Sequence, residues 1–300
     1  MIANIKQWFL SSRTWVLGIP YAWLLAFLIL PFLIILKISF SEMALSIPPY
    51  VPLVAAQNFI VNLHINLNNY VTLFTDPFYI SAYWNSLKIA FFSTLGCLII
   101  GYPMAYCIAR ANASYRSFLL MLVVLPSWTS FLLRVYAWMG ILQETGYLNQ
   151  ILMALHIIDS PIQFLYTNFA IYIGIIYAYL PFMVLPLYVS ISKIDWSLLK
   201  AAADLGARPW TAFWRITVPL TFVGILTGSL LVFIPVVGEF VIPDLLGGSG
   251  THMIGRVLWQ EFFNNRDWPL SAAIATLMLV LLLLPIYIFT RVEKNNGGAT

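Results

Sequence analysis

The chain has 300 residues, of which 61% are apolar and only 9% are charged, with a formal net charge of +4. Because soluble globular chains carry about 25% charged residues, this composition excludes an ordinary cytosolic protein, and the high hydrophobicity excludes intrinsic disorder. Nucleic-acid binding is not predicted, since Lys and Arg form no run. Cys97 and Cys107 would lie about 15 Å apart on one helix, so they predict no disulfide, and without a C-x-x-C pattern they predict no metal or redox site.

Six apolar runs predict an all-α polytopic membrane protein, because about 20 such residues cross a bilayer as a helix. The predicted transmembrane helices are Val16–Leu36, Ile89–Ala109, Phe118–Ile141, Asn168–Ser192, Ile216–Gly238 and Leu270–Thr290. Nine prolines lie within these runs or at their edges. Since a proline inside a helix removes a hydrogen bond and tends to kink it, the pattern favours a mobile helical bundle over a passive anchor.

The distribution of charge predicts the orientation. If the N-terminus is cytoplasmic, the inner segments, including Lys6, hold ten Lys and Arg residues and the outer loops hold three, whereas eight of the eleven acidic residues lie outside. The positive-inside rule therefore predicts that both termini are cytoplasmic. The outer segments 142–167 and 239–268 contain hydrophobic positions of their own, which predict short re-entrant or surface helices.

The inner segment 194–219 predicts two short helices joined by a turn. Asp195 suits the N-cap of a helix through Leu205, Gly206 suits a left-handed end to that helix, and Pro209 suits the first turn of the next one. Small residues on the first helix allow the close approach that docking in another protein's groove requires. They are Ala201, Ala202 and Ala203. Composition alone favours the alternative, a connector packed on the membrane surface.

The same segment resembles the E-A-A-x-x-x-G-x(9)-I-x-L-P signature of type I ABC-importer permeases. Lys200 stands where that family usually has Glu and Val218 where it has Leu, while the other positions match at the right spacing. In that family the loop is the coupling helix, which sits in a cleft of the cytoplasmic ATPase. The resemblance therefore implies ATPase coupling by Lys200, Ala201, Ala202, Asp204, Gly206 and Ala207. Lys200 reverses a charge, so the ion pair of the family's Glu is not expected here.

Segments 125–142, 178–188, 238–248 and 253–269 resemble polyamine-importer permeases, closest to the permease subunit of the putrescine importer and next to its spermidine-preferring paralogue. The sequence EFVIP at 239–243 favours the putrescine type. The resemblance implies a bacterial inner-membrane heterodimer with a second homologous permease subunit, two ATP-binding subunits and a periplasmic polyamine-binding protein. It also implies a permease domain at 85–290, preceded by a tail, the first helix and a long periplasmic loop (1–84) and followed by a cytoplasmic tail (291–300).

The chain has no G-x-x-x-x-G-K-[ST] phosphate loop, so ATP and magnesium are expected on the partner subunits, and no cofactor or catalytic residue is predicted in this chain. His64, His156 and His252 are far apart in sequence and are expected to be surface or loop residues rather than metal ligands. A secondary transporter should show inverted repeats and intramembrane acids, and a membrane enzyme should show clustered His, Asp or Glu; neither pattern is found. Spermidine or another small solute remains an alternative substrate.

A putrescine dication needs acids or aromatic rings along its path, because a bare charge in hydrocarbon is costly and aromatic faces attract ammonium groups. The candidates are Glu239, Asp244, Glu261, Trp128, Tyr136 and Tyr179. Glu239 closes the fifth span at its outer end; the alternative is an interfacial carboxylate that grips the binding protein. The aromatic residues also fit a purely interfacial role. Arg134, inside the third span, is expected to pair with Glu239 or Glu261 or to snorkel, and Lys88 to snorkel.

Overall fold

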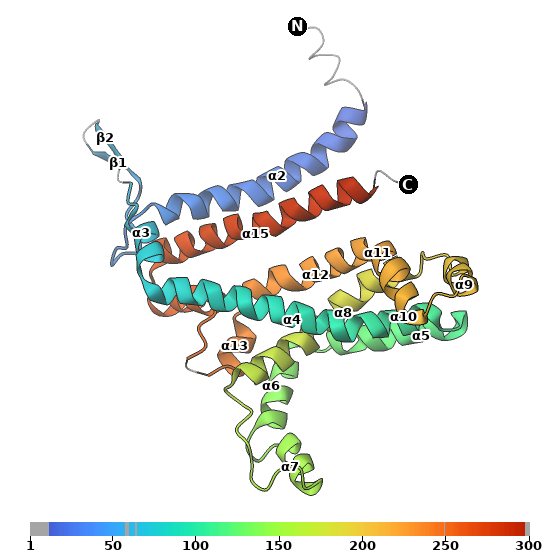
Figure 1. Ribbon diagram of the computed structural model, residues 1–300. Coiled ribbons are helices and arrows are strands. Elements are labelled where there is room, and N and C mark those ends of the chain that lie inside the picture. The colour runs from blue at the N-terminus through green and yellow to red at the C-terminus, as the bar shows by residue number, and fades with distance from the viewer. Residues whose placement is uncertain (1–11, 58–59, 64, 249, 298–300) are drawn as a thin grey trace. The chain divides into compact units, whose positions relative to one another are not determined.

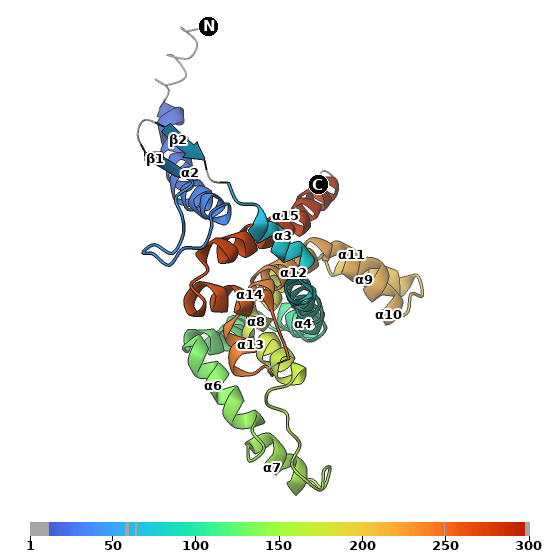
Figure 2. The same cartoon turned by 90° about the vertical axis from the view of Figure 1, so that its left-hand side faces the viewer.

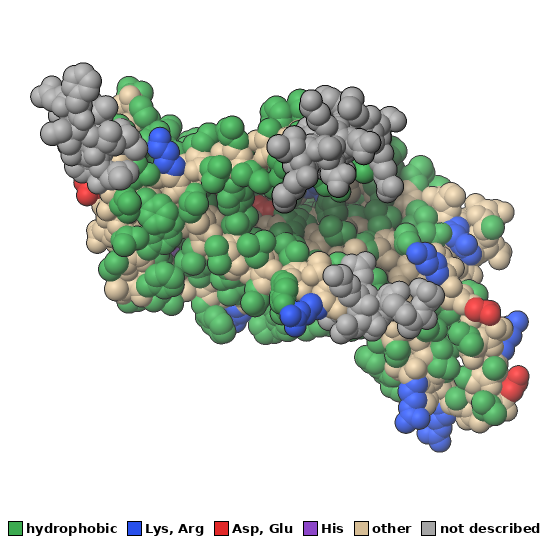
Figure 3. Space-filling model, turned by 90° about the horizontal axis from the view of Figure 1, so that it is seen from above, with side chains coloured by type: hydrophobic (Ala, Val, Ile, Leu, Met, Phe, Trp, Pro, Cys, Tyr) green, Lys and Arg blue, Asp and Glu red, His purple; other side chains and the backbone are tan. Residues whose placement is uncertain are grey.

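The computed structural model describes residues 12–57, 60–63, 65–248 and 250–297, in which helices joined by loops and one two-stranded hairpin are found (Figure 1). Lys6 and His64 lie outside the described residues. Contacts divide the chain into two units, Met1–Asp76 with Leu258–Leu279 and Pro77–Val257 with Val280–Thr300. Hydrophobic side chains cover most of the face in Figure 3, as expected of a surface that contacts lipid or other membrane subunits.

The first unit contains a long apolar helix followed by short elements. Its elements are α2 (Ser12–Ser39), the antiparallel strands β1 (Val54–Gln57) and β2 (Ile60–Leu63), α3 (Asn68–Thr75), the π-helical turn η3 (Gln260–Asn264) and the start of α15 (Trp268–Gly297). Side chains 16–31 of α2 are all exposed, so this helix is apolar around its whole circumference, as a helix surrounded by lipid is. Asn69 fixes α3 to the end of α2 by donating to the carbonyls of Ser39 and Ser41, at 3.0 and 2.9 Å.

Three helices pack together as the core of the second unit: α4 (Pro77–Arg110), α8 (Asn168–Ile191) and α12 (Phe222–Val237) (Figures 1 and 2). Glycines let α12 approach α8 closely. A β-carbon at Gly224 would lie 2.4 Å from Cβ of Ser190, and one at Gly228 would lie 2.8 Å from Sδ of Met183. Because these glycines are four residues apart, they form a G-x-x-x-G contact, the pattern that brings membrane helices into backbone contact.

The third predicted span is broken, so the prediction of one continuous helix over 118–141 is wrong. It consists of α5 (Ala113–Val124), the 3₁₀ turn η1 (Leu125–Trp128) and α6 (Phe131–Leu142), with a bend of 87° after Trp128, and α7 (Tyr147–Ala154) follows it. Pro126 lacks the N–H that would continue the α-helical ladder, so the chain tightens into η1. The extended backbone of Thr129 then redirects it.

The fifth predicted span is also bent, by 67°, between residues 209–220 and α12. The first part contains α10 (Pro209–Ala212), the π-helical turn η2 (Phe213–Thr217) and α11 (Val218–Leu220). At the bend, the Thr221 hydroxyl lies 2.9 Å from the carbonyl of Thr217 and 3.2 Å from that of Val218. A polar side chain inserted in this way is a recognised cause of a helix kink.

The remaining spans are helical, with some shifted boundaries. The described part of the chain has four helices long and apolar enough to cross a membrane, or up to six if each bent pair is one span. α4 begins at Pro77 rather than Ile89, and α15 continues into the predicted tail as far as Gly297. Short helices do occupy the outer segments, as predicted: α7, α13 (Val241–Leu245) and α14 (Ile254–Trp259).

Candidate functional site

The predicted helix–turn–helix is formed by α9 (Ser197–Asp204) and α10, and Gly206 ends the first helix in the left-handed region with φ +80°. The N–H groups of Gly206 and Ala207 donate to the carbonyls of Ala203 and Ala202, both at 2.9 Å. These are the bonds that complete a helix C-terminus. The turn is therefore formed as the sequence predicts.

The start of α9 differs slightly from the prediction. The helix begins at Ser197, so Trp196 occupies the N-cap position assigned to Asp195. The Asp195 carboxylate still accepts a hydrogen bond from the Ser197 N–H, at 2.9 Å. This hydrogen bond lowers the pKa of Asp195, because it stabilises the ionised form.

The two faces of α9 have different surroundings. On one face, Leu199, Lys200 and Ala203 line a cavity of about 310 Å³, which Ala207 also lines after the helix ends. The opposite face is open, and Leu205 beside it is 88% exposed. The predicted coupling residues are thus divided: Lys200 and Ala207 belong to the cavity, whereas the others lie outside its lining. Those others are Ala201, Ala202, Asp204 and Gly206.

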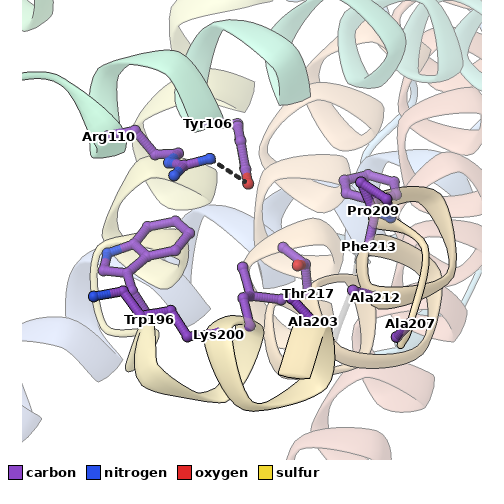
Figure 4. A pocket seen from close by; sticks show the side chains of 11 residues that line it. Tyr106, Arg110, Trp196, Lys200, Ala203, Ala207, Pro209, Ala212, Phe213 and Thr217 are labelled. Atoms are coloured by element: carbon purple, nitrogen blue, oxygen red, sulfur yellow. Dashed lines mark hydrogen bonds between the residues drawn. The ribbon is translucent and has the colours of Figure 1, made fainter. Parts of the chain in front are cut away.

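The far wall of the cavity comes from the end of α4. The guanidinium carbon of Arg110 lies 5.3 Å from the ring centre of Trp196 and 5.7 Å from that of Tyr106 (Figure 4). Arg110 also donates from Nη1 to the Tyr106 hydroxyl, at 3.4 Å. The Tyr106 and Trp196 rings meet edge-on with their centres 5.8 Å apart. The guanidinium therefore lies against both aromatic rings, with a cation–π contact to each.

Sequence reasoning missed this arrangement. Arg110 is one of the ten inner cations, and no motif in the sequence marks Tyr106 or Trp196. The available signal was an aromatic residue one turn before a terminal Arg, since residues four apart meet on a helix. Trp196 is far away in sequence, and only the folded chain shows that it joins them.

A second candidate region lies after α12, where Glu239 is buried with 8% exposure. Its Oε2 accepts from the Tyr179 hydroxyl at 2.5 Å, and its Oε1 accepts from the N–H groups of Val241 and Ile242 at 3.0 and 3.4 Å. The structure therefore brings together two of the predicted path residues, Glu239 and Tyr179. Both carboxylate oxygens have donors from the chain itself, as a buried carboxylate requires.

The predicted ion pair between Arg134 and Glu239 does not form. Arg134 instead lies over the ring of Phe131, with its guanidinium carbon 5.6 Å from the ring centre. Its Nε and Nη1 atoms are buried and have no hydrogen-bond partner. The carboxylate is satisfied by Tyr179 and by backbone N–H groups because the chain turns directly from α12 into α13.

The other predicted path residues of the second unit do not join this cluster. Asp244 pairs with Arg256 of α14, with Oδ1 and Nε 3.0 Å apart. Trp128 and Tyr136 are exposed on η1 and α6, and Glu261 belongs to the first unit, where its Oε2 accepts from Asn265. Within the described ranges, no three His, Cys, Asp or Glu side chains are placed to hold a metal ion.

Comparison with known proteins gives consistent results. Residues 97–294 match the family described as "Binding-protein-dependent transport system inner membrane component". The spermidine/putrescine transport system permease protein PotB of Haemophilus influenzae is 40% identical over 277 residues, which are 92% of each chain. The protein of the same description in Escherichia coli is 40% identical over 272 residues, 91% of this chain and 94% of the relative.

The fold is also found in a solved structure. The crystal structure of a bacterial ABC transporter that imports the acidic polysaccharide alginate contains a chain that aligns with a TM-score of 0.67 and 20% identity, covering 95% of this chain and 99% of that one. This likeness confirms the predicted fold class, an all-helical membrane permease of the ABC-importer type.

Proposed function

The chain belongs to the family of binding-protein-dependent transport system inner membrane components, and from this premise we propose that it moves a polyamine, with putrescine preferred, across the inner membrane. As a member it is a multi-pass, non-catalytic permease subunit of an ABC importer. The family implies ATPase subunits that hydrolyse ATP and a periplasmic binding protein that delivers the solute. Membership of this family also argues against the two alternative functions, a secondary transporter and a membrane enzyme.

The observation that carries the polyamine assignment is the 40% identity to spermidine/putrescine permeases over nine tenths of the chain. The residues favour putrescine through the EFVIP stretch at 239–243, which resembles the putrescine-type subunit. Spermidine is the alternative substrate. In this proposal the diamine passes the Glu239–Tyr179 cluster, and Asp244, Glu261, Trp128 and Tyr136 are further contacts along the route.

The proposed assembly is a heterodimer with a second homologous permease, bound to two ATPase subunits, with both termini in the cytoplasm. The open face of α9 supports docking to an ATPase, since Leu198 and Leu205 are exposed there beside the small side chain of Ala201. Exposed leucines next to a small-residue surface fit a protein partner better than water. We place the permease domain at 85–290, a range supported by the family match over 97–294.

Uptake by the reconstituted complex tests this proposal. The permease is purified with its partner subunits, placed in proteoliposomes, and supplied with binding protein and either radiolabelled putrescine or radiolabelled spermidine. We expect ATP-dependent uptake of both polyamines, with putrescine faster. Faster spermidine uptake would contradict the putrescine preference, and an assembled, ATP-hydrolysing complex that takes up neither would contradict the polyamine assignment.

A further inference from the structure

The cavity behind α9 has a marked positive charge. Its lining side chains include Arg110 and Lys200 and no carboxylate; the others are aromatic, aliphatic or hydroxyl-bearing. Asp195 and Asp204 are on the same loop but do not line it. A dicationic polyamine would be repelled from this cavity, so it lies outside the proposed substrate route.

Arg110 is exposed, makes cation–π contacts to two rings, and has unused hydrogen-bonding capacity. The rings of Tyr106 and Trp196 contact its guanidinium, which has five N–H donors in a fork that matches the oxygens of a phosphate. The hydrogen bond from Arg110 to the Tyr106 hydroxyl is long, at 3.4 Å. It is therefore weak and leaves the guanidinium N–H groups available to another acceptor. The Lys200 side chain extends beside Trp196 from the opposite wall (Figure 4). Two cations thus face one cavity from two different elements.

The position of the cavity along α4 fits a ligand at the membrane surface. The 34 residues of α4 make it about 51 Å long, whereas the hydrocarbon core of a bilayer is about 30 Å thick. Arg110 is the last residue of this helix, so it reaches the headgroup level or beyond. Basic pockets between membrane helices at this level bind lipid head groups.

We propose that this cavity binds a phosphate-bearing anion, either the headgroup of an anionic phospholipid or a free phosphate. Arg110 supplies a forked, charge-assisted contact and Lys200 a second positive charge. The volume of about 310 Å³ is at the lower end of ligand sites, which fits one phosphate group with a few further atoms. Leu199 and Phe213 provide apolar wall for the glycerol end of a lipid. The bound anion ties the end of α4 to the inner face of α9.

Calorimetric titration of the assembled transporter tests the site and separates the two sources. The complex is kept in a neutral detergent and phosphate-free buffer at low ionic strength, and is titrated with dihexanoylphosphatidylglycerol or with sodium phosphate. We expect one site per chain, and an affinity at least tenfold weaker in the double variant Arg110→Gln/Lys200→Gln, since each contact to a charged group contributes about 1.5–3 kcal/mol. Lys193→Gln is the matched control, because it removes a charge from an exposed position of the same loop outside the cavity.

Binding of phosphatidylglycerol alone identifies a lipid headgroup, and binding of both probes identifies the phosphate group as sufficient. The proposal is overturned if neither probe binds, or if the double variant binds as tightly as the parent. Should the double variant fail to assemble, Lys200→Glu decides the matter, because Lys200 is exposed and a reversed charge there changes the cavity without disturbing packing. It should weaken binding at least tenfold, and unchanged binding would overturn the proposal.

Discussion

Glu239 is a buried carboxylate whose oxygens both accept hydrogen bonds from within the chain, from the Tyr179 hydroxyl and from two N–H groups at the start of α13. Such a carboxylate is held at a fixed position, because moving it would leave buried donors unsatisfied. The Glu239 carboxylate would therefore already be oriented when a substrate ammonium group reaches it. The tyrosine hydroxyl, from α8, is the one contact of the three that a side-chain change can remove without altering the backbone.

Replacing Glu239 by Gln should lower uptake of putrescine about 5- to 100-fold, since the charge contributes about 1–3 kcal/mol to holding an ammonium group. The shape of the side chain is kept, and its NH2 group can donate to the Tyr179 oxygen while its carbonyl oxygen still accepts from the Val241 N–H, so assembly with the partner subunits should be intact. The measurement is initial-rate uptake by proteoliposomes with saturating binding protein. A parental rate would show that Glu239 is not on the route, and attention would move to Asp244 and Glu261.

Tyr179→Phe is the matched change, because it removes one hydrogen bond and leaves the charge of Glu239. We expect a loss of stability of about 1–3 kcal/mol, seen as a lower midpoint of thermal unfolding of the assembled complex. The fall in uptake should be smaller than that of Glu239→Gln. If Tyr179→Phe lowers uptake as strongly as Glu239→Gln, geometry rather than charge governs this site.

Among the structural elements, α9 shows how one short helix presents two unrelated surfaces. Its cavity side is closed by the end of α4, and its other side is open. Gly206 sets the direction in which the chain leaves the helix, because its φ of +80° lies in a region that costs other residues about 1–2 kcal/mol.

Ala201→Trp and Gly206→Val should both prevent association with the ATPase subunits while the permease still inserts in the membrane. The first places a large ring on the open face of α9, and the second strains the left-handed turn, since a β-branched residue fits poorly there. Co-purification of the ATPase measures the effect. Gly206→Asn is the control, because Asn tolerates this conformation; normal ATPase association of Ala201→Trp and Gly206→Val would contradict docking through this loop.

The contact between α8 and α12 leads to a further prediction. Gly228→Leu should prevent these helices from packing, since a β-carbon there already lies 2.8 Å from Sδ of Met183 and 3.2 Å from its carbonyl oxygen. We expect at least a severalfold loss of folded, detergent-stable protein, measured by size-exclusion chromatography. Gly140→Leu on α6 is the control, because nothing lies within 4 Å of a β-carbon at that position. Equal yields of the two variants would contradict a packing role for Gly228.

The sequence allowed the elements to be predicted where the signal is local. The turn after α9 follows from Gly206 and Pro209, and α8 follows from one apolar run that begins directly after Thr167, whose hydroxyl accepts from the Ala170 N–H. Pro126 indicates a kink near η1, but the size of the bend was not predictable, because hydropathy reports the length of an apolar run and not its direction. The partners of Glu239 and of Arg110 were not predictable either, since Tyr179 and Trp196 approach them only through tertiary packing.

For the molecule as a whole, the strongest expectation that sequence provides is its orientation in the membrane. In a variant that lacks Cys97 and Cys107, a cysteine at exposed Glu144 should react with a membrane-impermeant maleimide added to cells whose outer membrane is permeabilised. A cysteine at exposed Lys200 should react only after the inner membrane is opened. The opposite pattern would reverse the predicted topology. Both native positions are exposed in the structure, so accessibility within the chain does not limit labelling.

The backbone contact between α8 and α12 also determines how a displacement can travel. Because a β-carbon at Gly224 or Gly228 would clash with Ser190 or Met183 of α8, a slide of α12 by one residue would bring a larger side chain into this contact. We therefore expect α8 and α12 to move together. The bend between α11 and α12 is stabilised by hydrogen bonds, since the Thr221 hydroxyl lies 2.9 Å from both the Tyr102 hydroxyl and the Thr217 carbonyl oxygen. A tilt imposed on α10 would therefore be transmitted through α12, which is about 24 Å long, to Glu239 just after its far end.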